Sequence, residues 1–308
     1  YCFRGYDMIT VLAGGTGSVK LVRGLVAQEK KVNVISNVGD NYWLYGLYVC
    51  PDIDTIIYGL ADLLDQDKGW GIKKDTFNFK RQMEVFGEET WFGVGDREDN
   101  NKIKNVIKNL SDITKWMCEK FAVTANIIPV TDNTVETRIT TNKGELHLQE
   151  YWVKHRGMDP VEGIQYVGAD KARPNQEAIN AIHDSDMVIL APGNPLTSIG
   201  PMLQLKGIRK ELSKMKKKVV AVSPLIGDNS ISGPAAKYMQ AAGIESNAYG
   251  LAKMYSDVCS NVVVDTKDKA LVSKIQGLDM KAYETKITMK NKLAEEALAN
   301  FILKQVHV

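Results

Sequence analysis

Four short runs of apolar residues alternate with segments of helical spacing along the chain. They are Ile9–Ala13, Val32–Ser36, Met187–Ala191 and Val219–Ser223. Each run is rich in β-branched residues and free of acidic and basic side chains, as is typical of strands buried on both faces of a parallel sheet. Strands that alternate with helices predict an α/β fold, a doubly wound, Rossmann-like parallel sheet.

The middle of the chain follows a different pattern. Residues 62–120 have helical spacing, with three tryptophans along them. Apolar and polar residues then alternate in three segments, and a turn at Asn142–Gly144 predicts an antiparallel hairpin. We therefore expect a Rossmann-like core over residues 1–61 and 161–308, and a mainly helical insertion with a small sheet over residues 62–160. The alternating segments are Asn126–Pro129, Glu136–Thr141 and Glu145–Tyr151.

The composition is that of an ordinary globular protein. The 308 residues are 44% hydrophobic and 25% charged, and a net charge of +2 gives no sign of a nucleic-acid or membrane partner. No run approaches 18 apolar residues, and Tyr1–Asp7 lacks the apolar core of a signal peptide. The cysteines are few and widely spaced, which argues against disulfides and zinc and fits a reducing cytoplasm. The basic run Lys214–Lys218 is expected to be a solvated helix end.

A glycine-rich turn after the first apolar run is the strongest sign of chemistry. Strand, glycine turn and helix together set backbone N–H groups and a helix N-terminus against a phosphate. The turn is not a Walker A loop, because Val19 stands where that motif has glycine, and Lys20 replaces the third glycine of the dinucleotide motif. An ordinary strand-to-helix turn is the alternative. The predicted phosphate contacts are Gly14, Gly15, Thr16, Gly17 and Lys20.

Three aspartates follow the next predicted strand. Asp40 ends the segment that begins at Asn37, at the sheet edge where ligands bind, and could hold ribose or a metal or form a simple Asx turn. Asp52 and Asp54 stand one residue apart before an apolar helix that Thr55 opens, so one of them could cap it. With Asp40 they would form an oxygen-rich site suited to Mg²⁺ and phosphate.

Two more polar loops follow predicted strands. Leu190–Pro201 offers free N–H groups and hydroxyls for a second anion site, and Val222–Gly227 is similar. Three such loops at one sheet edge suggest a single long ligand. Gly95–Arg97 could bind an anionic or planar ligand or form a structural ion pair. The scattered histidines lack a nucleophile partner, so no hydrolytic triad is expected.

Taken together, these segments resemble the 2-phospho-L-lactate transferase family, which builds the deazaflavin coenzyme F420. The resemblance runs from about residue 8 to 290, with matching order and spacing. The segments that carry it are Leu12–Gly17, Asn37–Asp40 with Trp43, Pro51–Thr55, Gly69–Gly71 with Asp75–Phe77, Trp91–Phe92 with Gly95–Arg97, Asn194–Pro195 with Ser198–Pro201, and Ser223–Gly227.

The resemblance implies a reaction. A guanosine diphosphate that carries a phospholactyl, phosphoenolpyruvyl or phosphoglyceryl group is the donor, and the ribityl hydroxyl of 7,8-didemethyl-8-hydroxy-5-deazariboflavin is the acceptor. The hydroxyl attacks the phosphorus that bears the acid, GMP leaves, and Mg²⁺ is the expected cofactor. A cytoplasmic homodimer is also expected.

Residue roles follow from the resemblance. Asp40 and Asp54 are the implied catalytic residues, and these two with Asp52 are the implied metal ligands. The implied donor contacts are the five residues of the glycine turn with Asn37, Gly193, Asn194, Pro195, Ser198, Ser223 and Pro224, and the implied deazaflavin contacts are Trp43, Asp54, Thr55, Trp91, Phe92 and Arg97.

The chain departs from the family pattern at three places. Gly193 stands where the family has serine, Glu98–Lys102 replaces a segment with Thr-His on the acceptor side, and Glu284–Thr285 replaces Asp-Thr. A non-catalytic UDP-sugar-binding regulator of the gluconeogenesis-factor type shares the opening glycines and is the alternative function. A dinucleotide oxidoreductase is disfavoured by the absent third glycine.

Overall fold

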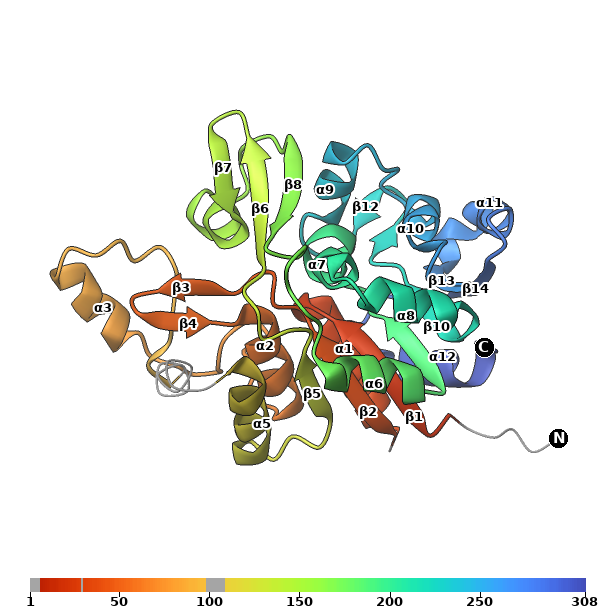
Figure 1. Ribbon diagram of the computed structural model, residues 1–308, viewed down its shortest axis with the longest axis horizontal. Helices are drawn as coiled ribbons and strands as arrows, with labels where there is room; N and C mark the ends of the chain where they lie inside the picture. The colour runs from red at the N-terminus through yellow and green to blue at the C-terminus, as the bar shows by residue number, and fades with distance from the viewer. Residues whose placement is uncertain (1–5, 29, 98–108) are drawn as a thin grey trace.

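A seven-stranded parallel sheet forms the centre of the protein (Figure 1). The computed structural model describes residues 6–28, 30–97 and 109–308. The four strands predicted from apolar runs lie side by side in the middle of the sheet, and the doubly wound α/β prediction is confirmed. In sheet order the strands are β14 (Lys281–Thr285), β13 (Asn261–Asp265), β10 (Val219–Val222), β9 (Met187–Leu190), β1 (Met8–Ala13), β2 (Lys31–Ser36) and β5 (Asn126–Pro129).

Helices pack on the sheet in two groups. In one, α1 contacts α2 and α12, and in the other α6 contacts β1, β5 and α8. The central strands are buried along nearly their whole length, because a parallel sheet covered on both faces leaves no strand face in water. The helices are α1 (Gly15–Val26), α2 (Pro51–Leu60), α3 (Asn78–Val85), α5 (Leu110–Lys120), α6 (Gln176–Asp184), α7 (Gly200–Gln204), α8 (Ile208–Lys214), α9 (Ala235–Ala241), α10 (Ala248–Tyr255), α11 (Val272–Gln276) and α12 (Lys292–Gln305).

A second, antiparallel sheet stands above the first in Figure 1. The predicted hairpin is confirmed as β6 (Glu136–Thr141) and β7 (Gly144–His147), and β8 (Gly163–Val167) pairs with β6 on its other side. The strand predicted to run to Tyr151 ends at His147, and a single π-helical turn, η2 (Glu150–Lys154), follows.

Two strands cross the predicted division of the chain. Asn126–Pro129 was placed in the insertion, but it pairs in parallel with β2 as the edge of the main sheet. Three of its four residues are buried, so it lacks true alternation, and Pro129 is tolerated at an edge. Conversely, β8 lies beyond residue 160 but belongs to the small sheet.

The helical insertion is only partly helical. Within the described residues between 62 and 120 the structure has α3 and α5, while the segments before and after α3 form turns and extended chain. Gly69 and Gly71 have φ values of +77° and +70°, a left-handed backbone that interrupts helical spacing. Trp70 therefore lies outside a helix. Trp91 also lies outside the helices, and of the three tryptophans only Trp116 lies in one. A short hairpin, β3 (Tyr42–Leu44) and β4 (Leu47–Val49), lies near α3 (Figure 1).

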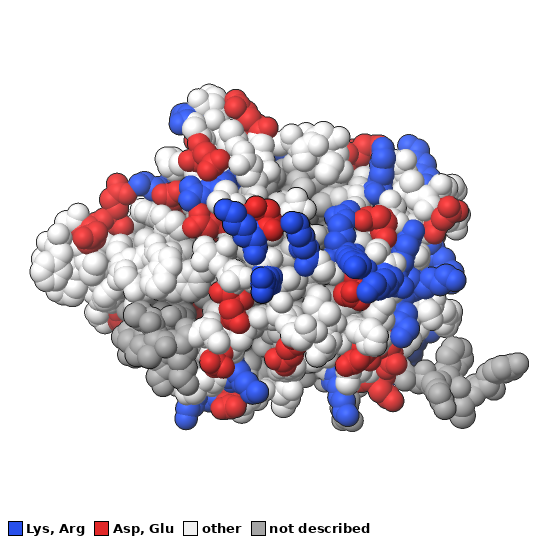
Figure 2. All heavy atoms as spheres, in the orientation of Figure 1, with Lys and Arg blue, Asp and Glu red and all other residues white. Residues whose placement is uncertain are grey.

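Basic side chains gather over the region of α8 and α10 (Figure 2). The run Lys214–Lys218 ends α8 and forms the 3₁₀ turn before β10, as predicted for a solvated helix end. Arg209 pairs with Asp257 at 2.6 Å and Lys214 with Glu211 at 2.6 Å. None of the described helices is long and apolar enough to cross a membrane. Cys50, Cys118 and Cys259 are buried.

The contact between α1 and α12 depends on a glycine. A Cβ at Gly24 would lie 2.4 Å from the carbonyl oxygen of Glu295, and the neighbouring Arg23 donates to both carboxylate oxygens of Glu295. Alanine normally stabilises an exposed helix by about 1 kcal/mol over glycine. Here we expect Gly24→Ala to lower the free energy of unfolding by about 1–3 kcal/mol through overpacking. Denaturant unfolding measures this, and a stabilised variant would contradict the close packing.

Candidate functional site

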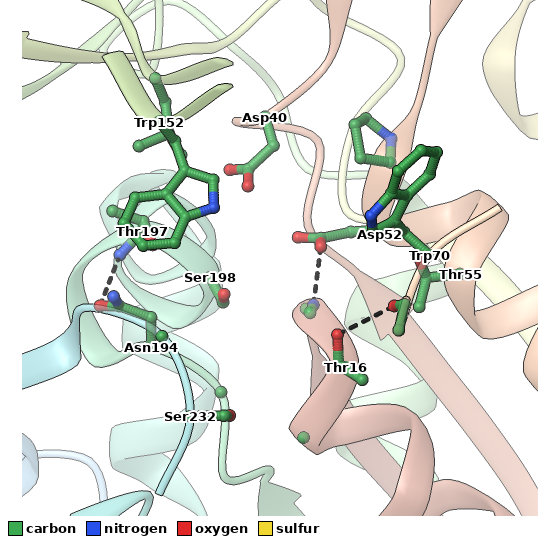
Figure 3. A pocket seen from close by; sticks show the side chains of 18 of the residues that line it. Thr16, Asp40, Asp52, Thr55, Trp70, Trp152, Asn194, Thr197, Ser198 and Ser232 are labelled. Carbon is green, nitrogen blue, oxygen red and sulfur yellow. Dashed lines mark hydrogen bonds between the residues drawn. The ribbon is translucent and has the colours of Figure 1, made fainter. Parts of the chain in front are cut away.

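A cavity of about 530 Å³ opens at the carboxyl ends of the central strands. The loops after β1, β2, β9 and β10 all contribute to its wall, as expected for the ligand-binding edge of an open α/β sheet. Figure 3 shows Asp40, Asp52 and Thr16 facing the same space from one side and Thr197 and Ser198 from the other. The predicted site residues that line it are Gly14, Gly15, Thr16, Gly17, Asp40, Asp52, Asp54, Thr55, Phe92, Gly193, Asn194, Ser198 and Pro224.

The glycine turn sets the N-terminal end of α1 against the cavity. Gly14 has an extended backbone, Gly15 begins the helix with a φ of +74°, and the hydroxyl of Ser18 donates back to the Gly14 carbonyl at 2.6 Å. The N-terminus of α1 therefore points into the cavity, where N–H groups that have no partner within the helix favour an anion.

In this structure the anion at that helix end is a carboxylate of the protein itself. Asp52 accepts from the Gly15 N–H at 2.6 Å and from the side-chain amide of Asn37 at 2.8 Å. Neither interaction was predicted from the sequence, because Asp52 lies 37 residues from Gly15 and 15 residues from Asn37 along the chain. The arrangement shows that the helix end accepts a negatively charged group.

Asn37 connects two of the aspartates. Its Nδ2 donates to Asp52, to Asp40 at 3.0 Å and to the carbonyl of Thr197 at 3.2 Å, while its Oδ1 accepts from the Gly39 N–H at 2.9 Å. The amide carries two hydrogens for three acceptors, so it cannot give each carboxylate a full hydrogen bond. Asn37 is fully buried and lies behind the cavity wall, holding both carboxylates in place.

The protonation of both carboxyls is shifted. Burial, with weaker opposition from the hydrogen bonds of Asn37 and Gly15, raises the pKa of Asp52 to about 6. Burial and then the nearby charge of Asp52 raise the pKa of Asp40 well above its usual value. Asp40 is partly buried and Asp52 is buried, and the two carboxyls share one amide donor, so a bound cation would stabilise their charged forms.

Asp54 and Thr55 lie in the first turns of α2 and face the cavity. The helix begins at Pro51, with Cys50 before it and no side-chain cap. The alternative in which one aspartate caps a helix that Thr55 opens is therefore wrong, because the helix begins four residues earlier than expected. Asp40, Asp52 and Asp54 all line the cavity, but within the described residues no three His, Cys, Asp or Glu side chains stand as a metal-binding group, so the three-aspartate metal site stays a prediction.

The loop after β9 is organised by Asn194. Its side chain accepts from the N–H groups of Leu196 and Thr197 and so caps the π-helical turn Pro195–Ile199. Ser198 and Thr197 face the cavity, but Pro195 is buried and does not line it.

Gly193 is a close-packed position in this chain. A Cβ there would lie 2.7 Å from the Gly14 carbonyl oxygen, so the serine that the resembled family carries has no room without a shift. The glycine therefore allows the loop after β9 to approach the glycine turn.

The loop after β10 contributes less than predicted. The hydroxyl of Ser223 is buried and pairs with the backbone of Leu225, both as donor and as acceptor at 3.1 Å. Pro224 reaches the cavity wall, and a following stretch that includes Ser232 and Tyr238 lines it as well.

Lys20, predicted as a phosphate contact, lies outside the cavity. Its amine donates to the carbonyl of Met289 at 3.2 Å, and its side chain does not line the cavity. A residue in α1 one turn from Gly17 projects along the helix side rather than from its end. Among the described residues that line the cavity, Lys68 is the one cation, and it pairs with Asp65 at 3.2 Å. The sequence reasoning missed Lys68.

The predicted ring contacts are dispersed. Trp43 is 55% exposed on the β3–β4 hairpin and stacks on Tyr48, away from the cavity, while Trp91 lies in an adjoining groove. Arg97 is exposed and donates to the Lys73 carbonyl at 3.3 Å. The atypical segment Glu98–Lys102 lies outside the described residues.

Two other tryptophans flank the cavity. Trp70 and Trp152 are each 44% exposed and stand on opposite sides of the aspartates (Figure 3). The sequence indicated Trp70 only as one of three tryptophans in the expected insertion and as part of the Gly69–Gly71 segment. Trp152 was not predicted, because the alternating pattern before it indicated a strand to Tyr151 where the structure has a π-helical turn.

The shifted carboxyls make a prediction about stability. A folded-state pKa above the unfolded value means that the folded protein holds protons more tightly, so its stability falls as pH rises from about 4 through the folded pKa. We expect Asp40→Asn to raise the unfolding midpoint of the ligand-free, metal-free protein at pH 7 by roughly 2–4 °C and to reduce its fall between pH 5 and pH 7. Thermal unfolding across pH measures this, and a variant with an unchanged pH profile would contradict it.

Comparison with known proteins identifies the family. The profile described as 2-phospho-L-lactate transferase CofD matches residues 9–305. A 2-phospho-L-lactate transferase of Methanosarcina mazei is 38% identical over 84% of this chain and 88% of its own length. A phosphoenolpyruvate transferase of Streptomyces coelicolor is 37% identical over 87% and 88% of the two chains.

A solved structure shares the fold. A member of the UPF0052 family from Bacillus halodurans superposes with a TM-score of 0.62 at 14% identity, covering 97% of this chain and 99% of the other. The family match over residues 9–305 includes all the segments that line the cavity and nearly all of the main sheet. The chain belongs to the 2-phospho-L-lactate transferase (CofD) family.

Proposed function

We propose that this protein transfers a phospholactyl, phosphoenolpyruvyl or phosphoglyceryl group from a guanosine diphosphate-linked donor to the ribityl hydroxyl of 7,8-didemethyl-8-hydroxy-5-deazariboflavin. The carrying observation is the pair Asp40 and Asp52, held by Asn37 at the N-terminus of α1 inside the cavity. That arrangement joins an anion site to two carboxylates, which is what a transfer between phosphate esters requires. The transferase names of the relatives favour this reaction over a sugar-nucleotide-binding regulator.

The donor diphosphate is proposed to occupy the end of α1. The Gly15 N–H that Asp52 now engages would turn to a phosphate oxygen, and the hydroxyls of Thr16 and Ser198 line the same space. The loop after β9 and Pro224 would contact the guanosine side of the donor.

The side chains present fit a divalent cation together with a phosphate ligand. Mg²⁺ is commonly held by one or two carboxylates, with substrate phosphates and water completing its shell. Asp40 and Asp52 are the carboxylates that would hold it, since both are short of positive charge. When bound, the ion would neutralise charge on the phosphate oxygens during transfer.

The acceptor is proposed to reach the aspartates past Trp70 and Trp152, whose exposed rings flank the cavity. Its hydroxyl oxygen forms the new bond to the phosphorus that bears the three-carbon acid, and the bond from that phosphorus to the GMP oxygen breaks. Asp54, which faces the cavity from the first turn of α2, would orient the hydroxyl and accept its proton.

The decisive experiment supplies the purified protein with the deazariboflavin, Mg²⁺ and each of the three guanylylated acids in turn. We expect GMP release and a more acidic deazaflavin product with at least one donor, because the relatives carry both phospholactate and phosphoenolpyruvate names. Chromatography with mass detection measures both products. No GMP with any donor, combined with tight binding of a UDP-sugar, would favour the regulator.

Two lysines provide a matched test of where the phosphates bind. Lys68 lines the cavity, whereas Lys20 donates to a backbone carbonyl outside it. We expect Lys68→Met to lower kcat/KM for the donor roughly 10–100-fold, by loss of one charge-assisted contact to phosphate. Lys20→Met should change it less than about threefold. A larger loss for Lys20→Met than for Lys68→Met in steady-state assays would show that Lys20, and not Lys68, contacts the phosphates.

A further inference from the structure

A groove of about 480 Å³ adjoins the cavity and shares Lys68, Trp70, Gly93 and Val153 with it. Its outer wall is one face of α3. The four residues from that helix and its N-cap that line the groove have the spacing i, i+3, i+4, i+7, so they lie on a single face. They are Phe77, Lys80, Arg81 and Glu84.

The helix α3 is held in place at its beginning and carries no buried residue. Asp96 accepts from the N–H groups of Asn78 at 3.0 Å and Phe79 at 2.8 Å, and the Phe79 ring lies 6.1 Å from that of Tyr45. Phe79 packs against the small apolar cluster that includes Leu44 and Val94, so the helix is held from that side and its other face lines the groove.

The cations of this face are available to a ligand. Lys80 lies 3.9 Å from Glu84, and Arg81 donates to Asn78, so within the described residues both interact only with side chains of their own helix. Contacts of this kind on an exposed helix stabilise weakly and are readily exchanged.

The chemistry of the groove differs from that of the cavity. Three aromatic residues, Trp70, Phe77 and Trp91, line it, and the Lys68 amine lies 5.5 Å from the Trp70 ring centroid and 5.3 Å from that of Phe77. Three cations, Lys68, Lys80 and Arg81, face one carboxylate, whereas three carboxylates face one cation in the cavity. Aromatic walls with excess positive charge fit a planar ring that carries a negative charge.

We propose that the groove binds the ring end of the acceptor as an anion, with Lys80 and Arg81 stabilising its deprotonated hydroxyl. This rests on the proposed function, which supplies an acceptor whose ring hydroxyl is conjugated with a carbonyl and is therefore more acidic than a simple phenol. Nearby cations lower the pKa of such a hydroxyl. Trp70, shared by both spaces, would contact the ring while the ribityl chain runs inward to the aspartates.

The test measures acceptor binding without turnover. The ring spectrum differs between the neutral and the anionic form, so titration of the bound deazariboflavin across pH gives the pKa of its hydroxyl. We expect the wild-type protein to lower this pKa relative to free acceptor. The variant Lys80→Gln/Arg81→Gln should move it back towards the free value and weaken acceptor binding roughly tenfold, with the donor KM unchanged.

Two control variants separate local from general effects. Glu84→Gln removes the opposing charge from the same helix face and should lower the bound pKa further, while Lys115→Gln alters an exposed lysine of α5 outside the groove and should change nothing. Lys80 and Arg81 have no role in the core, so thermal unfolding should show that the double variant folds.

The outcomes distinguish this proposal from the proposed function. If the wild-type protein binds the acceptor and releases GMP but the double variant has the same affinity and the same bound pKa, the groove proposal is overturned and the transferase proposal stands. If the double variant loses donor affinity instead, the groove binds phosphate and the proposal is wrong. If the wild-type protein neither binds the acceptor nor releases GMP, both proposals fail.

Discussion

The hydrogen bond from the Gly15 N–H to Asp52 is the interaction on which the site depends. It ties the start of α1 to the start of α2 at 2.6 Å and sets a carboxylate where the helix end favours negative charge. A hydrogen bond to a charged group contributes about 1.5–3 kcal/mol, but here it opposes the cost of burying the carboxylate. The pKa of Asp52 is raised because the cost of burying its charged form exceeds the stabilisation from the two hydrogen bonds that it accepts. The hydrogen bond between Gly15 and Asp52 is therefore one that a bound phosphate could displace, with a cation then neutralising the Asp52 carboxylate.

The fold makes this possible through close backbone approach. A Cβ at Gly14 would lie 2.6 Å from the Asp52 carboxylate and 2.8 Å from the Ser198 Cβ, and one at Gly17 would lie 2.5 Å from the Pro192 carbonyl oxygen. The loops after β1 and β9 therefore meet without side chains between them, which follows from the parallel pairing of the two strands in the sheet. Gly14 and Gly17 are therefore required for the close packing of these two loops, whether or not they also contact a phosphate.

The predictable part of the protein is the part with local signals. Buried runs such as Met187–Leu190 gave the central strands, and the glycine turn and Asp40 gave one wall of the cavity. The sequence could not show that Asn126–Pro129 joins the main sheet, because a four-residue strand is specified by its partner β2 rather than by its own pattern. It also indicated Lys20 and missed Lys68, because proximity to the glycines along the chain is not proximity to the helix end.

The distribution of charge explains why two adjoining spaces suit one reaction. Three carboxylates, those of Asp40, Asp52 and Asp54, line the cavity, and they would favour the proposed anionic donor only with a cation bound. The groove beside it needs no such partner, since Lys68, Lys80 and Arg81 already outnumber Glu84. An anionic ring would therefore be repelled by the ligand-free cavity and drawn to the groove, leaving the neutral ribityl chain beside Asp54. Opposite charge on the two sides of Trp70 would thus orient the acceptor before any bond forms.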